Sequence, residues 1–217
     1  MNSKFILKFN CGELGPVLLK DRFVEEIKRG IELMDNINEH KDIPKWAFEK
    51  IEIIKPDPMW EDKGIQEKEE LCNLLSPFGV KQVEHIGSTA IPNLPAKPII
   101  DLMASIPSFQ HINKIAKNLF LHDWHYVPPE LDNQPWRRFF VKVKDDKRVA
   151  HLHLMQEGED RWEKQLEFRN KLRTNAHLAE EYASIKSQLA QEFNNDRERY
   201  TEAKTEFINK VLFNSGV

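Results

Sequence analysis

The chain has few cysteines, no long apolar run and almost no excess of charge of either sign. Cys11 and Cys72 are its two cysteines, and their spacing fits neither a disulfide framework nor a metal-binding motif. No apolar run approaches the length of a membrane-spanning helix, and Phe5–Leu7 is too short for the core of a signal peptide. These absences predict a cytoplasmic protein without a membrane partner and without a disulfide scaffold.

Charge and length narrow the class further. The 32 Lys and Arg residues face 35 Asp and Glu residues, so the formal net charge at pH 7 is only −3. Such a chain exerts no overall attraction on nucleic acid, which is therefore not expected as a partner, and any anion site must be local. A chain of 217 residues with 40% hydrophobic residues can bury a core, and its length predicts one domain plus an appendage.

The stretch EHIGSTAIPNLPAKPIIDLMA carries the strongest functional signal. Its pattern predicts a short strand, Val83–Ile86, a Gly87-Ser88 turn, a proline-rich connector and a second strand, Ile99–Ala104, that carries one acid. Glycine lets the backbone approach a phosphate without a Cβ in the way, and a serine hydroxyl and nearby N–H groups can hold phosphate oxygens. Asp101, on the strand that faces this turn, stands where a phosphate-bound Mg²⁺ would be held.

This block resembles the signature of the nucleotidyltransferase superfamily, in which a hydrophobic-Gly-Ser turn is followed by Asp-x-Asp or Asp-x-Glu. It resembles the GrpB family more closely, because members of that family carry a near-identical EHIGST…KPIID block. Further landmarks of the family recur in order between Ile51 and Leu212: KPDPMW, Arg138-Phe139-Phe140, HLHL, FRNKLR and two Tyr-x3-Lys pairs. The resemblance implies a nucleotidyltransferase-like fold.

Hydrophobic periodicity supplies the expected elements. Together with the resemblance it predicts the α+β class: a nucleotidyltransferase-like mixed β-sheet with helices packed on it and a helical C-terminal cap. Strands are expected at Ile51–Pro58, Val83–Ile86, Ile99–Ala104, Trp124–Val127, Phe139–Val143 and Val149–Met155. Helices are expected at Ile65–Leu75, at Phe109–Leu121 and, in three pieces with breaks near Asn175 and Asn194–Asp196, from Asp160 onward. A hairpin turn is expected at Asp145-Asp146-Lys147.

Residues 1–50 lie outside the resemblance and are expected to form an N-terminal helical appendage to a GrpB-like domain at residues 51–217. Apolar residues recur at helical spacing over Asp21–Ile37, which predicts an amphipathic helix, and a short second helix is expected near Lys45–Lys50. An isolated helix of this length is marginal in water, so its apolar stripe must be covered. Its own domain or a second subunit could cover the stripe, which leaves a homodimer open.

The acid of the second strand is the first candidate for chemistry. Strand alternation places Asp101 and Met103 on one face. In active nucleotidyltransferases both carboxylates of the motif lie on that face and share the metal ions, but a thioether is a poor ligand for Mg²⁺. A two-metal mechanism would therefore lack one acid, unless His153, or Glu130 from the intervening loop, supplies the ligand. The alternative role for Asp101 is to cap a neighbouring turn.

A His-x-His pair is the second candidate. Alternation places the imidazoles of His151 and His153 on one face, about 6–7 Å apart. If their strand lies beside the Asp101 strand, His153 could stand in the place of the missing carboxylate, as a metal ligand or phosphate donor. His85 is a weaker candidate for the same pocket. A site of one Asp and two or three His would suit Zn²⁺, Mn²⁺ or Fe²⁺ better than Mg²⁺, whereas the alternative is a pair of hydrogen-bonded structural histidines.

Cations on the apolar, inward sides of the C-terminal helices point to an anion site, because cations avoid such positions unless they are paired or face a polar cavity. By helical spacing these cations are Arg169, Arg173, Lys186 and Lys204. Lys97 and Arg138 are expected to face the same space, whereas Arg137 is expected on the surface. The alternative is that each cation extends along apolar surface to water or pairs with an acid such as Glu167 or Glu181.

Together these residues favour a protein that binds a nucleotide or another phosphorylated small molecule with a divalent metal, Mg²⁺ or Mn²⁺, with Zn²⁺ as a further option. The expected phosphate-binding residues are Gly87, Ser88, Thr89, Lys97, Arg138, Arg169, Lys186 and Lys204. Asp101 and His153 are the expected catalytic residues, and Asp101, His151 and His153 are the expected metal ligands.

Three functions remain open on this sequence. As an enzyme, the protein would transfer a nucleoside monophosphate. The first alternative is a non-catalytic nucleotide- or anion-binding module that has lost the Asp-x-Asp pair, for which Met103 is the best evidence. The second alternative is a metal-dependent phosphoesterase with His and Asp ligands. The sequence names neither the acceptor nor the base.

Overall fold

The computed structural model describes residues 46, 49, 51–193 and 197–213. The chain divides into two units, Met1–Ile43 and Pro44–Val217, and every described residue belongs to the second. The helix expected over Asp21–Ile37 lies outside the described residues, as does the one near Lys45–Lys50 except for two positions. No helix in the described part of the chain combines the length and the apolar character needed to cross a membrane.

A five-stranded mixed sheet forms the centre of the second unit, with the strand order β1-β2-β5-β4-β3. The strands are β1 (Val83–Ile86), β2 (Ile100–Ile106), β3 (Trp124–Val127), β4 (Arg137–Lys144) and β5 (Lys147–Gln156). β2 and β5 are parallel, and the other neighbouring strands are antiparallel. The predicted mixed sheet is confirmed, and its parallel pair lies at the centre.

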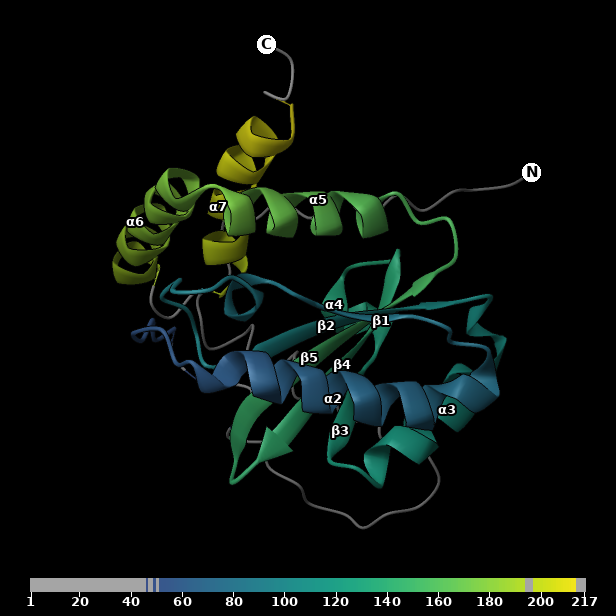
Figure 1. Ribbon diagram of the computed structural model, residues 1–217. Helices are drawn as coiled ribbons and strands as arrows, with labels where there is room; N and C mark the ends of the chain where they lie inside the picture. The colour runs from purple at the N-terminus through teal and green to yellow at the C-terminus, as the bar shows by residue number, and fades with distance from the viewer. Residues whose placement is uncertain (1–45, 47–48, 50, 194–196, 214–217) are drawn as a thin grey trace, which may run out of the picture. The chain divides into compact units, whose positions relative to one another are not determined.

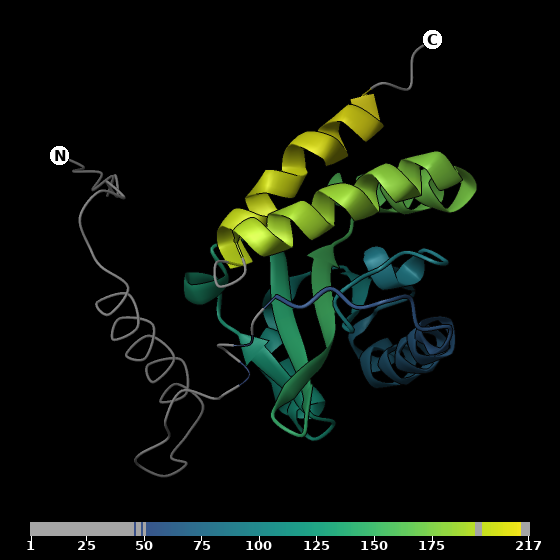
Figure 2. The same ribbon diagram turned by 90° about the vertical axis from the view of Figure 1, so that its left-hand side faces the viewer.

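Helices pack on the sheet in two groups (Figures 1 and 2). α2 (Met59–Leu75) and α3 (Ile112–Phe120) lie on one face of the sheet, and the short α4 (Pro129–Asp132) precedes β4. The C-terminal cap consists of α5 (Arg161–Thr174), α6 (Ala176–Glu192) and α7 (Arg197–Phe213), which lie above the ends of the strands in Figure 2. The predicted α+β fold with a helical C-terminal cap is confirmed.

The two faces of the sheet differ because side chains alternate along each strand. Leu102, Leu152 and Phe140 are paired across three strands and are fully buried on the face that α2 covers. The same register places Asp101 beside His151 on the opposite face, which we call the site face.

α2 begins earlier than the apolar pattern predicts. The Asp57 carboxylate accepts a hydrogen bond from the Met59 amide at 2.9 Å, which satisfies one of the free N–H groups at the start of the helix. The strand expected at Ile51–Pro58 is wrong, because this segment forms only a single bridge, between Ile54 and Ala96. Its prolines have no N–H group to donate to a longer ladder.

A two-residue turn joins β4 to β5, as predicted. Asp145 and Asp146 both have positive φ angles, 52° and 59°, which is the geometry of a tight type I′ hairpin turn. A bulge next to Lys142 then shifts the pairing by one residue, so that Phe139 lies opposite His153. The bulge therefore decides which β4 side chains reach the site face.

Candidate functional site

The Gly87 turn lies directly against the Asp101 carboxylate. Gly87 has a φ angle of 70°, a conformation that residues with a Cβ rarely adopt. A Cβ at this position would lie 2.5 Å from Oδ2 of Asp101 and 2.9 Å from its Cβ, closer than such atoms can approach. Glycine is therefore needed here both for the positive φ angle and because a Cβ would not fit. The turn and the Asp101 carboxylate are in direct contact.

His151 contacts the same carboxylate from the neighbouring strand. The parallel pairing of β2 with β5 places it opposite Asp101, as expected for a His-x-His strand beside the Asp101 strand. An ionised carboxylate can only accept, so Nδ1 of His151 donates to Oδ1 of Asp101 at 2.9 Å. Burial raises the pKa of Asp101, but this hydrogen bond and the charges of His151, His153 and Lys204 lower it more, to about 2. The Asp101 side chain is 32% exposed, so a ligand can reach it.

Met103, at the second position of the motif, belongs to the core. Its side chain is 0% exposed and packs with Ile86 and Met155. The partly buried side chains that pack on this cluster are Trp136, Trp162 and Leu166. An acid at this position would be enclosed by these apolar side chains. Two residues beyond Asp101, the site face is already part of the hydrophobic core.

His153 is enclosed by aromatic rings. Trp136 stacks on it with ring centroids 6.3 Å apart, and the Phe139 ring lies 5.3 Å away. Nδ1 of His153 faces a guanidinium nitrogen of Arg137, which can only donate, so Nδ1 accepts and we assign the ring proton to Nε2. Burial, and then the Arg137 charge, hold the pKa of His153 well below its ordinary value. A neutral ring in this state has no lone pair left for a metal ion.

Arg137 anchors this aromatic cluster and is not the surface residue that the sequence suggested. Its Nε and a terminal nitrogen donate to the two carboxylate oxygens of Asp132 at 2.8 and 2.6 Å. The two side chains are 14% and 7% exposed, so this is a largely buried, bidentate ion pair. Arg137 thus connects α4 to His153 on the site face.

Arg138 does not face the anion site, contrary to the expectation from sequence. Its guanidinium lies 4.2 Å from the centre of the Phe109 ring and donates to a main-chain carbonyl on the other face of the sheet. The bulge beside Lys142 is the physical reason, because without its one-residue shift Arg138 would lie opposite His153. No pattern in the sequence predicts the bulge, so the sequence does not predict that Arg137 lies on the site face.

The donors around Asp101 do not fit the expected metal ion. The described residues include no group of three or more His, Cys, Asp or Glu side chains that could hold one. Asp101 is bonded to His151, the accepting nitrogen of His153 faces Arg137, and Glu130 is exposed on α4. Mg²⁺ and Mn²⁺ prefer several oxygen ligands, whereas Glu84, the carboxylate opposite Met103 on this face, is already paired with Arg169 and Lys68. The three-ligand set of Asp101, His151 and His153 is therefore not formed.

Two lysines of the cap converge on the space above Asp101. Lys186 on α6 is 1% exposed; its Nζ donates to the Pro95 carbonyl at 2.6 Å and lies 4.8 Å from the centre of the Tyr182 ring. Burial, and then the charge of Lys204, lower the pKa of Lys186 to about 7 against the opposing effect of Asp101. Burial also lowers the pKa of Lys204 on α7 to about 8, although Asp101 acts in the opposite direction. Both ammonium groups are therefore short of compensating negative charge.

Tyrosine rings connect these lysines to the connector and the turn. The Tyr200 ring contacts Nζ of both Lys97 and Lys204, at 4.3 and 4.4 Å from its centre. The Ser88 side chain lies close enough to Tyr182 to lower its pKa, against the larger effect of burial. Burial raises the pKa of both tyrosines, to about 12 for Tyr200, so their hydroxyl groups stay neutral. Lys97 and Lys204 thus share the Tyr200 ring and Ser88 lies beside Tyr182, whereas a shared binding site for these residues stays a prediction.

Arg169 of α5 is turned inward as predicted, whereas Arg173 is exposed, and both have protein partners. Arg169 donates to Oε2 of Glu84 and to the carbonyl of His85, both at 2.9 Å. Nε of Arg173 donates to the carbonyl of Ala90 at 2.7 Å. These bonds fasten α5 to β1 and to the turn that follows it, so the charge of Arg169 is already matched by a carboxylate.

Thr89 and His85 support the turn from the other face of the sheet. Nε2 of His85 lies 3.0 Å from Oγ1 of Thr89, which donates to the Ile99 carbonyl at 3.1 Å. Burial lowers the pKa of His85 to about 4, so its ring is neutral. Gly64 on α2 makes room for this ring, because a Cβ there would overlap it. Neither Thr89 nor His85 belongs to the pocket for which the sequence suggested them.

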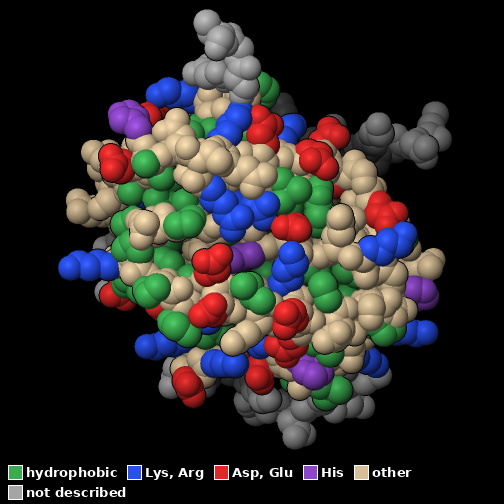
Figure 3. All heavy atoms as spheres, in the orientation of Figure 1, with side chains coloured by type: hydrophobic (Ala, Val, Ile, Leu, Met, Phe, Trp, Pro, Cys, Tyr) green, Lys and Arg blue, Asp and Glu red, His purple; other side chains and the backbone are tan. Residues whose placement is uncertain are grey.

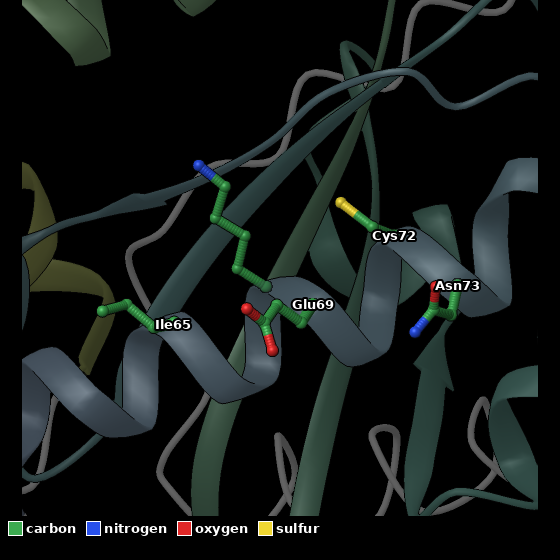
Figure 4. Close-up of a pocket in the computed structure, with 5 residues that line it drawn as sticks. Ile65, Glu69, Cys72 and Asn73 are labelled. Atoms are coloured by element: carbon green, nitrogen blue, oxygen red, sulfur yellow. The ribbon is translucent and has the colours of Figure 1, made fainter.

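A hollow of about 480 Å³ lies elsewhere, on α2. Its lining residues are Ile65, Lys68, Glu69, Cys72 and Asn73, four of which are labelled along the helix in Figure 4. None of them belongs to the Asp101 cluster, and Lys68 pairs with Glu84 at 3.5 Å. Figure 3 shows basic side chains gathered over α5 with acidic side chains next to them, in agreement with the ion pairs between α5, β1 and α2.

Comparison with known proteins gives one consistent family. The family model described as GrpB protein matches residues 50–213. The chain is 34% identical over 159 residues to the protein YqkA of Bacillus subtilis (strain 168), a match that spans 73% of this chain and 45% of YqkA, less than half the length of that relative. It is 29% identical over 135 residues to the glutamate-rich protein GrpB of Alkalihalophilus pseudofirmus, which covers 61% of this chain and 78% of that protein. The crystal structure of the conserved protein GrpB from Enterococcus faecalis superimposes with a TM-score of 0.65 at 30% identity, over 74% of this chain and 94% of that one.

Proposed function

The chain belongs to the GrpB family, and on that premise we propose that it binds a nucleotide or another phosphorylated small molecule between the Gly87-Ser88 turn and the helical cap. In this proposal the protein is a binding module and not a transferase. The phosphate would bind at the turn that the resemblance to nucleotidyltransferases implies, and lysines of the cap would supply the positive charge.

The observation that carries the proposal is the pair formed by Lys186 and Lys204. These lysines come from two different helices; Lys186 is buried, Lys204 is partly buried, and the Asp101 charge acts on both. Buried cations of this kind are unfavourable unless an anion compensates them. A phosphate group placed beside Ser88 and both ammonium groups would supply that compensation, and the neutral Tyr182 and Tyr200 hydroxyl groups could donate to its oxygens.

Transfer of a nucleoside monophosphate is the less favoured reading. A two-metal mechanism needs one ion for the attacking oxygen and one for the leaving group. Asp101 is the single carboxylate of the motif, and the second position is the buried Met103. The metal-dependent phosphoesterase is less favoured for a related reason, because the accepting nitrogen of His153 faces Arg137.

Calorimetric titration of the full chain with nucleoside mono-, di- and triphosphates tests the proposal. We expect Lys186→Met and Lys204→Met each to weaken binding of the best ligand at least about tenfold, a loss of roughly 1.4 kcal/mol. Lys164→Met is the matched control, because Lys164 is exposed on α5. Unchanged affinity in both variants, or no binding of any phosphorylated ligand by the unmodified protein, would contradict the proposal.

Incubation with a labelled nucleoside triphosphate and divalent metal separates binding from transfer. We expect binding without release of pyrophosphate. Sustained turnover that Asp101→Asn abolishes would establish the transferase instead, whereas turnover that survives this change would point to a contaminant.

A further inference from the structure

We propose that this site takes a polyphosphate chain as the free anion and not as its magnesium complex, with His151 bonded to the carboxylate that would hold the metal and with Lys186 and Lys204 supplying the charge. The inference rests on the proposed function and specifies its ligand: a diphosphate or triphosphate chain, free or attached to a nucleoside. Three independent observations carry it.

The first observation is that protein groups already contact both oxygens of the Asp101 carboxylate. Oδ1 accepts the hydrogen bond from Nδ1 of His151, and Oδ2 lies against the Gly87 backbone so closely that no Cβ would fit. The parallel pairing of β2 with β5 fixes His151 at this place. A divalent ion would have to displace an imidazole that the sheet itself holds in position, and it would gain one carboxylate in return.

The second observation is that the neighbouring positions offer no uncommitted donor: Glu84, opposite Met103 on β1, is paired with Arg169. Met103 is fully buried beneath Trp136 and Trp162, and the accepting nitrogen of His153 faces Arg137. An ion at Asp101 would therefore have to take its other ligands from water and from the ligand itself. Such an ion would also approach two ammonium groups whose charge is already poorly compensated.

The third observation is the excess of positive charge. Lys97 and Lys204 lie over the Tyr200 ring, and Lys186 lies over the Tyr182 ring, with the charges of Lys186 and Lys204 close enough to influence each other. The charges of Lys186 and Lys204 thus act on one carboxylate that is already hydrogen-bonded. A di- or triphosphate chain can match this excess, whereas coordination of Mg²⁺ cancels part of the charge that the lysines would recognise.

Titration of the full chain with inorganic tripolyphosphate and with adenosine triphosphate, each in EDTA and in excess MgCl₂, tests the inference. We expect binding in EDTA, and a dissociation constant at least about fivefold higher in MgCl₂. Equal affinity for the two ligands would assign recognition to the phosphate chain, and tighter binding of adenosine triphosphate would add the nucleoside to the same metal-free ligand. Binding that occurs only with Mg²⁺ would overturn the inference and leave the proposed function intact, whereas the absence of binding in both buffers would overturn the proposed function itself.

A second experiment tests the part assigned to His151. Mn²⁺ binding to the unmodified chain and to His151→Ala can be measured by electron paramagnetic resonance, with circular dichroism as the check on folding and His151→Gln as the variant of more similar size. Because an ion at Asp101 must take its other ligands from water and from the anion, we expect the His151 variants to bind Mn²⁺ when tripolyphosphate is present, and this binding to be lost in the double variant with Asp101→Asn. The inference fails if the unmodified protein binds Mn²⁺ through Asp101, or if both folded His151 variants bind none in the presence of tripolyphosphate.

Discussion

The site face of the sheet has two halves, an open half around Asp101 and a dry half around Met103. Their central residues are two positions apart on β2, and the halves differ in charge and in exposure. Around Asp101 the side chains are charged and partly exposed, and the nearby cations are lysines whose burial works against them. Around Met103 the side chains are mostly apolar and buried or partly buried, and the two cations are matched by acids, Arg137 by Asp132 and Arg169 by Glu84. The boundary between binding site and core therefore falls between the two positions that an Asp-x-Asp motif would use together.

This difference between the two halves implies that replacing Met103 by an acid would not by itself restore a two-metal site. Two catalytic carboxylates need a common hydrated space for their metal ions. Here that space ends at Asp101, because Trp136 and Trp162 close the sheet above Met103. A binding role needs only the open half, which is the half that keeps the turn, the carboxylate and the lysines.

The largest expected effect comes from placing a charge in the dry half. Met103→Asp should lower the free energy of unfolding by roughly 3–5 kcal/mol, because it buries an uncompensated carboxylate among apolar side chains. Urea denaturation measures the change, and Met103→Leu, which keeps the side chain apolar, should cost less than about 1.5 kcal/mol. A stable Met103→Asp protein with a gain in metal affinity would show that the two halves form one site.

The next effect concerns the cation of the dry half. Arg137→Met should lower the free energy of unfolding by roughly 2–3 kcal/mol, because Asp132 and the accepting nitrogen of His153 lose their donor. Arg138→Met is the matched control on the opposite face, where the guanidinium donates to main-chain carbonyls, and it should cost less than about 1 kcal/mol. Equal losses in the two variants would mean that the bulge does not separate the roles of these neighbours.

A smaller effect is expected at the turn. Gly87→Ala should cost roughly 1–3 kcal/mol and should abolish phosphate binding, since the added Cβ meets Asp101 and the φ angle is positive. Gly158→Ala is the control for strain alone, because Gly158 also has a positive φ angle, 85°, but has nothing within 4 Å of an added Cβ. The difference between the two unfolding free energies measures the contact with Asp101. Two equal losses would remove this contact from the explanation.

The smallest effect is a pH dependence of the open half. Lysine binds phosphate in its charged form, so affinity should be complete below a pH of about 7, where Lys186 titrates, and should fall as the pH rises past about 8, where Lys204 titrates. Titrations at about pH 7 and pH 9 should differ by roughly tenfold. The double variant Lys186→Met with Lys204→Met should not show this fall, and a fall of the same size in that variant would assign it to the ligand.

The stability of the unliganded protein should change in the opposite direction. Both lysines have pKa values below the ordinary 10.5, so between about pH 7 and that value the unfolded chain binds more protons than the folded one. Their contribution to the free energy of unfolding therefore rises with pH across this window. Urea denaturation at several pH values checks the sign.

Much of the fold follows from the sequence because its signals are local. The strands and the three cap helices follow from apolar periodicity, and the inward faces of Lys186 and Lys204 follow from helical spacing. Asp101 and His151 could be expected to meet once their strands were adjacent, and the parallel pair confirms that they are. The roles proposed for these residues remain predictions.

The remaining features depend on information that periodicity does not contain. The bulge beside Lys142 places Arg137 on the site face and Arg138 on the opposite face, and no residue type in the sequence predicts this bulge. The cations on the cap helices look alike in a helical stripe, but Arg169 finds Glu84 and the carbonyl of His85, and this pairing is a property of the assembled fold. Sequence therefore identified the helix faces better than it identified the partners on them.

The paired residues of the site lie far apart along the chain. This separation decides when the site can form during synthesis. The bond between Asp101 and His151 joins residues 50 positions apart, and the bond from Lys186 to the Pro95 carbonyl joins residues 91 positions apart. During synthesis the Gly87 turn and its acid leave the ribosome well before β5 and long before the cap, and contacts between such distant segments form late. Asp101 begins as an ordinary solvated aspartate, and a growing chain that ends before α7 has the acid but not Lys204. If the protein binds the proposed anion, binding thus becomes available only after α7 has left the ribosome, so that a growing chain that ends before α7 cannot compete for the same anion.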